Sequence, residues 1–140
     1  MSEFTLQANS KIGKGKQWPL PKPVEHMKRF QIYRWDPEKN ANPQMDTFEI
    51  DRDHCGPMVL DALTTINDQI DPTLSFRRSC REGVCGSCAM NIDGKNRLAC
   101  LTPMDELKKG TSRITPLPAP NARMASIIAS STIGCCPMPR

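Results

Sequence analysis

The sequence predicts an α+β fold in which a mixed sheet packs on one main helix. Residues 28–36 and 45–51 alternate apolar and polar side chains, as half-buried strands do. One amphipathic segment follows Pro57. Further on, Asp93-Gly94 separates two short segments, which is a strong signal for a tight hairpin. Strands on both sides of a single helix favour one sheet covered on one face.

The helix is predicted from the spacing of its apolar residues. Apolar side chains recur every three or four positions at Val59, Leu60, Leu63, Ile66 and Ile70. Asp53 or Gly56 is the expected cap, and Pro57 suits the first helical position. Asp71-Pro72 ends the helix, because the residue before a proline avoids helical angles. The apolar face is therefore expected to form the core.

The remaining elements are short. We expect a strand at 73–79, a cysteine-rich loop at 80–88, and hairpin strands at 89–92 and 96–100. One helical turn is expected between 104 and 109, and a last strand at 113–117.

Proline marks both ends of the chain. Eight of the thirteen prolines lie near the two ends, so neither end is expected to form a regular element. We therefore divide the chain into an extended basic and proline-rich arm at 1–27, a folded domain at 28–118 and an irregular tail at 119–140.

Charge and hydropathy exclude several classes of function. The formal net charge is +4, and the basic residues of the arm lack the interleaved aromatics of a nucleic-acid surface, so we expect no nucleic-acid partner. No run of 18 or more apolar residues predicts a membrane span. The first residues have neither the apolar region of a signal peptide nor the pattern of a transit peptide, so we expect the chain to stay where it is made.

Four cysteines carry the chemical signal. They follow the pattern Cys80-x4-Cys85-x2-Cys88-x11-Cys100, which is the spacing of plant-type [2Fe-2S] proteins. Such a cluster needs four thiolates in two pairs, one pair for each iron. A loop can supply three sulfurs, and we expect a neighbouring strand to supply Cys100. These four residues are the predicted cluster and metal ligands.

The residues around the cysteines fit this interpretation. Gly83 and Gly86 permit positive φ angles, so that backbone N–H groups can point at the sulfurs. Arg77, Arg78 and Arg81 would raise the reduction potential of an anionic cluster. Ser79 and Ser87 flank ligands, and each either donates to a sulfur or satisfies the loop.

Structural zinc is the main alternative, but zinc sites usually need two C-x2-4-C knuckles or a Cys/His pair. The sequence has one C-x2-C, and both His26 and His54 lie outside the window. We expect these histidines at the surface or as caps, and Cys55 as a small buried apolar residue. Cys135 and Cys136 are interpreted as tail thiols.

No paired carboxylates, nucleophile elbow or phosphate loop is found, so we expect no catalytic residue in the chain itself. The chemistry would be that of the cluster, with the protein supplying position and electrostatics.

The sequence then resembles a known family. Residues 79–94, SCREGVCGSCAMNIDG, resemble the [2Fe-2S] loop of the succinate dehydrogenase iron-sulfur subunit, in the succinate dehydrogenase/fumarate reductase iron-sulfur protein family. Residues 55–63 and 70–78 are similar to its helix and to the approach to its loop. The resemblance covers about residues 28–118.

The resemblance implies a β-grasp, ferredoxin-like fold and the same four cysteine ligands. It implies an electron-transfer subunit without a catalytic site in succinate:quinone oxidoreductase, respiratory complex II. Electrons would pass from the FAD of the flavoprotein subunit towards quinone. The partners would be that flavoprotein and membrane-anchor subunits, at the cytoplasmic face of the bacterial inner membrane. An unassembled chain would be soluble.

The sequence departs from the family after residue 118. Members continue into a domain with [4Fe-4S] and [3Fe-4S] clusters on C-x2-C-x2-C-x3-C-P-like runs, and no such run occurs here. A truncated, non-functional form is therefore one alternative. The others are a stand-alone [2Fe-2S] ferredoxin, a fumarate reductase subunit and a zinc-stabilised interaction module.

Overall fold

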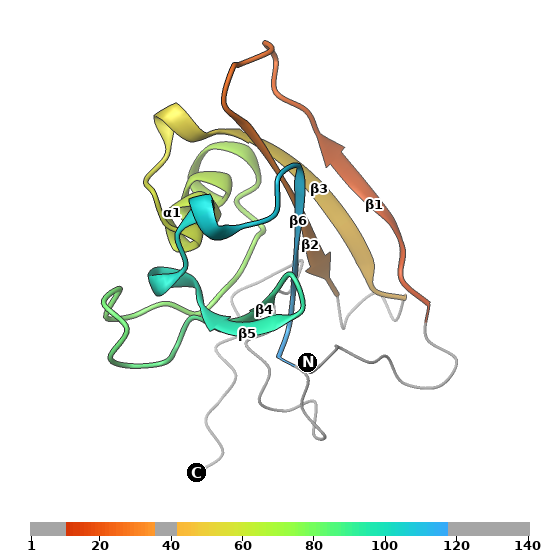
Figure 1. Cartoon of the computed structure of the whole chain (residues 1–140). Coiled ribbons are helices and arrows are strands. Elements are labelled where there is room, and N and C mark those ends of the chain that lie inside the picture. Colours follow the sequence, from red (N-terminus) through yellow and green to blue (C-terminus); the bar gives the residue numbers. More distant parts are fainter. Residues whose placement is uncertain (1–10, 36–41, 118–140) are drawn as a thin grey trace.

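The computed structural model, which describes residues 11–35 and 42–117, shows a twisted mixed sheet with one helix packed on one face (Figure 1). The order of the strands in the described sheet is β1-β3-β2-β6-β4-β5. The strands are β1 (Gly13–Trp18), β2 (Met27–Arg34), β3 (Gln44–Asp51), β4 (Ala89–Ile92), β5 (Lys95–Leu98) and β6 (Thr111–Thr115). The helices are η1 (Arg52–His54), α1 (Val59–Thr65), η2 (Ile66–Ile70), η3 (Ala99–Leu101) and η4 (Met104–Glu106). This arrangement confirms the predicted α+β class.

The sheet is mixed because its central strand β2 pairs antiparallel on one side and parallel on the other. Strands β2 and β3 are antiparallel, with Phe30 opposite Phe48, whereas β2 and β6 are parallel. Side chains alternate between the two faces along β2 and β3, so that one face buries Phe30, Ile32, Phe48 and Ile50. The predicted hairpin also forms, since β4 and β5 pair antiparallel and Asp93 and Gly94 both have positive φ.

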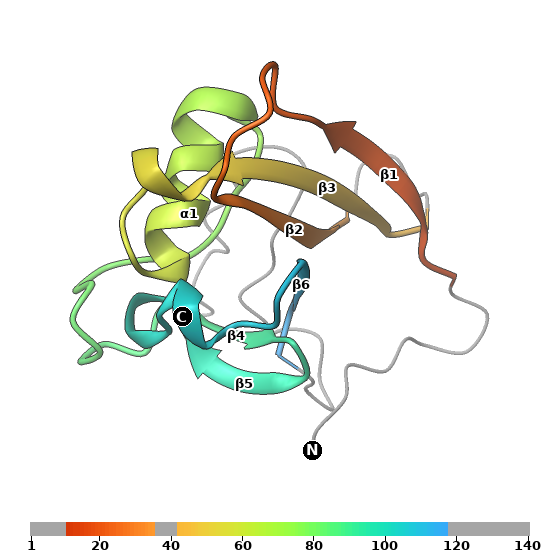
Figure 2. The ribbon, with the colours of Figure 1, turned by 45° about the horizontal axis from the view of Figure 1, so that its top comes forward.

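The core lies between this face and the helix, and Figure 2 shows from a second side how the helix lies beside the sheet. Helix α1 buries Val59, Leu60, Ala62 and Leu63, and the turn η2 that continues it buries Ile66. The predicted apolar face of the helix is therefore confirmed as core.

The start of the helix differs from the prediction. Pro57 is not the first helical residue, because Met58 pairs with Pro103 as an isolated bridge and the Pro57 carbonyl accepts from the Met104 N–H at 2.8 Å. These contacts keep 57–58 extended, and the helix begins at Val59. Asp61, rather than Asp53 or Gly56, accepts a hydrogen bond from the Met58 N–H at 3.1 Å.

Strand β1 corrects the prediction that the arm contains no regular element. Gly13–Trp18 pairs parallel with β3, and the Lys16 N–H donates to Asp46 Oδ1 at 2.8 Å. The Trp18 ring stacks on Phe48 with centroids 6.1 Å apart. The nearby prolines begin only at Pro19, so they follow the strand without interrupting it. The tail at 119–140, with Cys135 and Cys136, lies outside the described residues.

The strand predicted at 73–79 is wrong, since this described segment forms no strand. At its start, side chains bond some of the backbone groups, and the Leu74 N–H donates to the Asp71 carbonyl at 3.2 Å. Asn67 Nδ2 donates to the carbonyls of Pro72 at 3.4 Å and Leu74 at 2.5 Å, and Asp71 Oδ1 accepts from the Thr73 N–H at 3.0 Å. The start of the approach to the cysteine loop is therefore held by local contacts rather than by the sheet.

Trp18→Ala is expected to lower the free energy of unfolding by about 1–2 kcal/mol, because it removes the stacked pair and the apolar contact that holds β1. Chemical denaturation followed by far-UV circular dichroism measures the change. Gln17→Ala, an exposed neighbour in the same strand, should change stability by at most about 0.5 kcal/mol. Equal stabilities of the two variants would show that β1 contributes nothing to the fold.

Candidate metal centre

The four predicted ligands lie on a loop and on the segment that follows β5. Residues 80–88, here called the cluster loop, lie at the opposite end of the molecule from β1 (Figures 1 and 2). The loop leads directly into β4, and the β4–β5 hairpin returns the chain to Cys100. Cys85 is exposed and Cys80 is half-buried, whereas Cys88 and Cys100 are 3% and 6% exposed.

Left-handed backbone geometry shapes the cluster loop. Gly83 and Gly86 have φ angles of 78° and 70°, as the sequence predicted. Arg81 also has a positive φ, of 60°, which the sequence analysis missed. Arginine rarely adopts this region, so no pattern in the sequence indicates it.

Backbone N–H groups converge on Cys80. The N–H groups of Val84 and Cys85 each lie 3.2 Å from Cys80 Sγ, and that of Glu82 lies 3.5 Å away. Donors aimed at one sulfur favour its thiolate over its thiol. This confirms the predicted use of backbone amides around the sulfurs.

Cys85 has a similar environment at the exposed tip of the loop. The Ser87 N–H lies 3.4 Å from Cys85 Sγ. Hydrogen bonding, first from the Ser87 side chain and then from the backbone, lowers the pKa of the Cys85 thiol to about 6. Both the backbone N–H and the side chain of Ser87 thus favour the thiolate of Cys85, one of the four predicted ligands.

The second pair of cysteines is buried. The Cys100 N–H lies 3.4 Å from Cys88 Sγ, and the Ala99 N–H donates to the Cys88 carbonyl at 3.1 Å. Burial and the neighbouring Cys88 raise the pKa of Cys100, while a hydrogen bond with the Gly83 backbone lowers it. Cys100 lies in η3 and not in the predicted strand, because β5 ends at Leu98 and the chain turns towards Cys88.

The other singled-out residues lie apart from this centre. Cys55 is half-buried against the core, and burial raises the pKa of its thiol. His26 contacts Asp53 and His54 contacts Asp51 at the surface, as expected. Arg78 donates to Thr64 Oγ1 at 3.1 Å and lies over the ring of Phe76.

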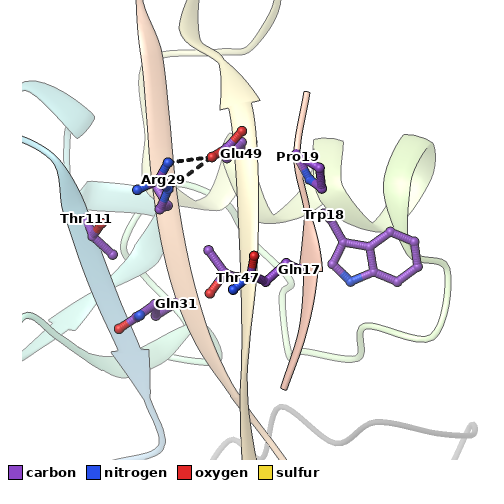
Figure 3. A pocket seen from close by; sticks show the side chains of 8 residues that line it. All are labelled: Gln17, Trp18, Pro19, Arg29, Gln31, Thr47, Glu49 and Thr111. Atoms are coloured by element: carbon purple, nitrogen blue, oxygen red, sulfur yellow. Dashed lines mark hydrogen bonds and ion pairs between the residues drawn. The ribbon is translucent and has the colours of Figure 1, made fainter. Parts of the chain in front are cut away.

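A shallow polar hollow lies on the face of the sheet opposite the helix (Figure 3). Its wall includes the ion pair between Arg29 and Glu49, whose Nη2 and Oε1 are 2.6 Å apart. It is lined by Gln17, Trp18, Pro19, Arg29, Gln31, Thr47, Glu49 and Thr111. None of the four predicted ligands lines it.

Comparison with known proteins shows the family to which this chain belongs. Residues 29–126 match the family described as the 2Fe-2S iron-sulfur cluster binding domain. The chain belongs to this family. The predicted [2Fe-2S] cofactor is thereby confirmed, in preference to structural zinc. The assignment of its four ligands stays a prediction.

Two relatives of this 2Fe-2S domain support the resemblance seen in the sequence. The chain is 59% identical over 118 residues to the succinate dehydrogenase iron-sulfur subunit of Paracoccus denitrificans, covering 84% of this chain and 45% of that protein. It also resembles a chain of the Mycobacterium smegmatis Sdh1 complex in the apo form, with 27% identity, a TM-score of 0.56, and coverage of 75% of this chain and 42% of that one. The chain therefore spans less than half the length of these relatives.

Backbone hydrogen bonds relate the four cysteines two by two. The Cys85 N–H donates to Cys80 Sγ, and the Cys100 N–H donates to Cys88 Sγ. Within the described residues, no group of three Cys, His, Asp or Glu side chains could hold a single metal ion. The donors that reach Cys80 and Cys85 would favour thiolates, which are the form that binds iron. No helix in the described ranges is long and apolar enough to cross a bilayer.

Gly83→Ala is expected to loosen the cluster more than Gly86→Ala. Both substitutions place a side chain at positive φ, which costs roughly 1–2 kcal/mol. At Gly83 the new Cβ would also lie 2.5 Å from Leu101 Cδ1, whereas Gly86 faces open space. The measurement is the rate at which visible absorption disappears in the presence of an iron chelator. A wild-type rate for Gly83→Ala would contradict the described loop.

Proposed function

We propose that this chain is the iron-sulfur electron-transfer subunit of a succinate dehydrogenase. In this proposal Cys80, Cys85, Cys88 and Cys100 hold a [2Fe-2S] cluster that receives electrons from the FAD of a flavoprotein subunit, on the way towards quinone. The observation that carries the proposal is the donor arrangement around two cysteine pairs in a chain 59% identical to a protein of that name.

The cluster, when bound, supplies one-electron chemistry. The protein's own contribution is electrostatic. Amides of Glu82, Val84, Cys85 and Ser87 point at two of the sulfurs and stabilise negative charge there. The exposed guanidinium groups of Arg77 and Arg81, close in sequence to the ligands, favour the same charge. Both effects stabilise the reduced state, which carries one more negative charge.

The exposed position of Cys85 fits an electron-accepting surface, because transfer from a flavin needs close approach of a partner. In this proposal the chain serves the enzyme as a non-catalytic subunit that carries electrons. The same proposal includes membrane-anchor subunits as further partners and a peripheral position at the cytoplasmic face of the inner membrane. The [2Fe-2S] pattern on these 140 residues would serve the uptake of the electron from the flavoprotein.

The test is succinate-dependent reduction of the cluster. The full chain is purified anaerobically and mixed with the flavoprotein subunit of succinate dehydrogenase from the same organism, and low-temperature EPR follows the reduced cluster. We expect succinate to produce the signal only when the flavoprotein is present, and dithionite to produce it in either case. A signal with dithionite but none with succinate and flavoprotein would favour a stand-alone ferredoxin.

A further inference from the structure

The segment between the helix and the cluster loop has no strand to hold it. Residues 71–79 lead from the end of η2 to Cys80, and this described stretch is irregular throughout. Several of its residues are exposed, and the first fully buried apolar side chain is Leu74, at 1% exposed. The position of the first end of the cluster loop therefore depends on side-chain contacts to the segment that precedes it.

Arg34 supplies contacts of this kind from the centre of the sheet. It ends β2 on the inward face that also carries Phe30 and Ile32, and its side chain is 1% exposed. Its Nη1 donates to Asp71 Oδ2 at 2.8 Å, and its Nη2 donates to Thr73 Oγ1 at 2.8 Å. A guanidinium group can bond both residues at once because its donors form a rigid fork.

Asp71 and Thr73 also bind each other. Asp71 Oδ1 accepts from the Thr73 hydroxyl at 2.6 Å and from the Thr73 N–H at 3.0 Å. With the two bonds from Arg34, these contacts close a ring through three side chains. The turn at 71–73 is thereby fixed to β2. Arg34 and Asp71, which make this contact, are 37 positions apart in the sequence.

We propose that Arg34 is a positioning residue for the cluster loop, acting through Asp71 and Thr73 on the point at which residues 74–88 leave the core. The inference rests on the proposed function only in its assignment of the cluster to that loop. The adjacent contact agrees with it, since Asn67 Nδ2 donates to the Leu74 carbonyl and holds the next residue of the segment against the helix.

Asp46 provides a matched comparison on the other side of Arg34. Its Oδ2 lies 3.5 Å from Arg34 Nη1, and its Oδ1 accepts from the Lys16 N–H of β1. Asp46 is as buried as Arg34. Besides its long contact with Arg34, it bonds the edge strand β1, on the side of the sheet away from the cluster loop. Loss of its charge should therefore affect β1, while Arg34 keeps its shorter bonds to Asp71 and Thr73.

The experiment compares Thr73→Val, Thr73→Ser, Arg34→Lys and Asp46→Asn in the full chain. Hydrogen–deuterium exchange by mass spectrometry reports the opening of residues 74–88 in the metal-free protein. EPR of the reduced protein reports the surroundings of the cluster in the loaded form. The exchange measurement does not need the cluster. The inference can therefore fail while the proposed function stands, and the proposed function can fail while the inference stands.

We expect Thr73→Val and Arg34→Lys to speed exchange in 74–88 by about tenfold, through loss of a charge-assisted hydrogen bond, and to alter the EPR line shape. Thr73→Ser keeps the hydroxyl and should behave as wild type. Asp46→Asn should speed exchange in β1 alone. Wild-type exchange at 74–88 in Thr73→Val, or equal acceleration across the whole sheet in both Thr73→Val and Arg34→Lys, would overturn the proposal.

Discussion

Cys85→Ser should abolish the [2Fe-2S] cluster, leaving less than about a tenth of the wild-type iron and acid-labile sulfide, because four thiolates are needed to close the cage. Serine keeps the size of the side chain but presents a hydroxyl in place of a soft thiolate. Cys85 is exposed, so the substitution itself should leave the apolar core intact. Iron and sulfide assays together with the visible spectrum measure the loss.

Cys55→Ser is the matched control. Cys55 packs against the core outside the cluster loop, and its thiol accepts a long contact of 3.7 Å from the Thr65 hydroxyl. This variant should retain two irons and two sulfides per chain, as expected for one [2Fe-2S] cluster. Full cluster content in Cys85→Ser, or loss of the cluster in Cys55→Ser, would contradict the assignment of ligands.

Arg34→Met should lower the free energy of unfolding by about 3–5 kcal/mol, because it leaves buried carboxylates without their cation. Arg34 and Asp46 are 1% and 2% exposed, and Asp71 is 6% exposed. Although burial alone would raise it, the pKa of Asp71 is lowered by hydrogen bonds from Thr73 and Arg34, so Asp71 is ionised at neutral pH. Urea denaturation followed by circular dichroism measures the change.

Arg29→Met is the control for the charge itself. Arg29 also forms an ion pair, with Glu49, but its side chain is 43% exposed and lies on the face of the sheet opposite the helix. Exposed pairs contribute about 0–1 kcal/mol, so this variant should be close to wild type. If Arg34→Met proves no less stable than Arg29→Met, the buried ion cluster does not stabilise this fold.

The parts of the fold that follow from local pattern were predictable. Alternation along residues 28–36 and 45–51 locates β2 and β3, because one residue in two must face the core. The dipeptide Asp93-Gly94 locates the β4–β5 turn, since both residues adopt positive φ there. Cysteine spacing locates the candidate ligands for a similar reason, because the pattern reflects a requirement of the cluster itself.

The errors arise where long-range contacts override local pattern. Strand β1 is stabilised by β3, about thirty residues later in the sequence, and nothing within Gly13–Trp18 indicates that partner. Residues 73–79 contain strand-like Leu74 and Phe76, yet the Leu74 carbonyl accepts from Asn67 of the preceding helical segment and not from a strand. The buried position of Arg34 could have been predicted, because alternate residues of a strand share a face and Phe30 and Ile32 point to the core. An arginine on that face needs buried anionic partners.

The most direct test of the account is the cofactor content of the full chain purified anaerobically. We predict two irons and two acid-labile sulfides per chain, visible absorption bands, and a rhombic EPR signal after reduction with dithionite, as a [2Fe-2S] cluster requires. A colourless protein that contains zinc or no metal would contradict the account, because electron transfer by this chain depends on the cluster.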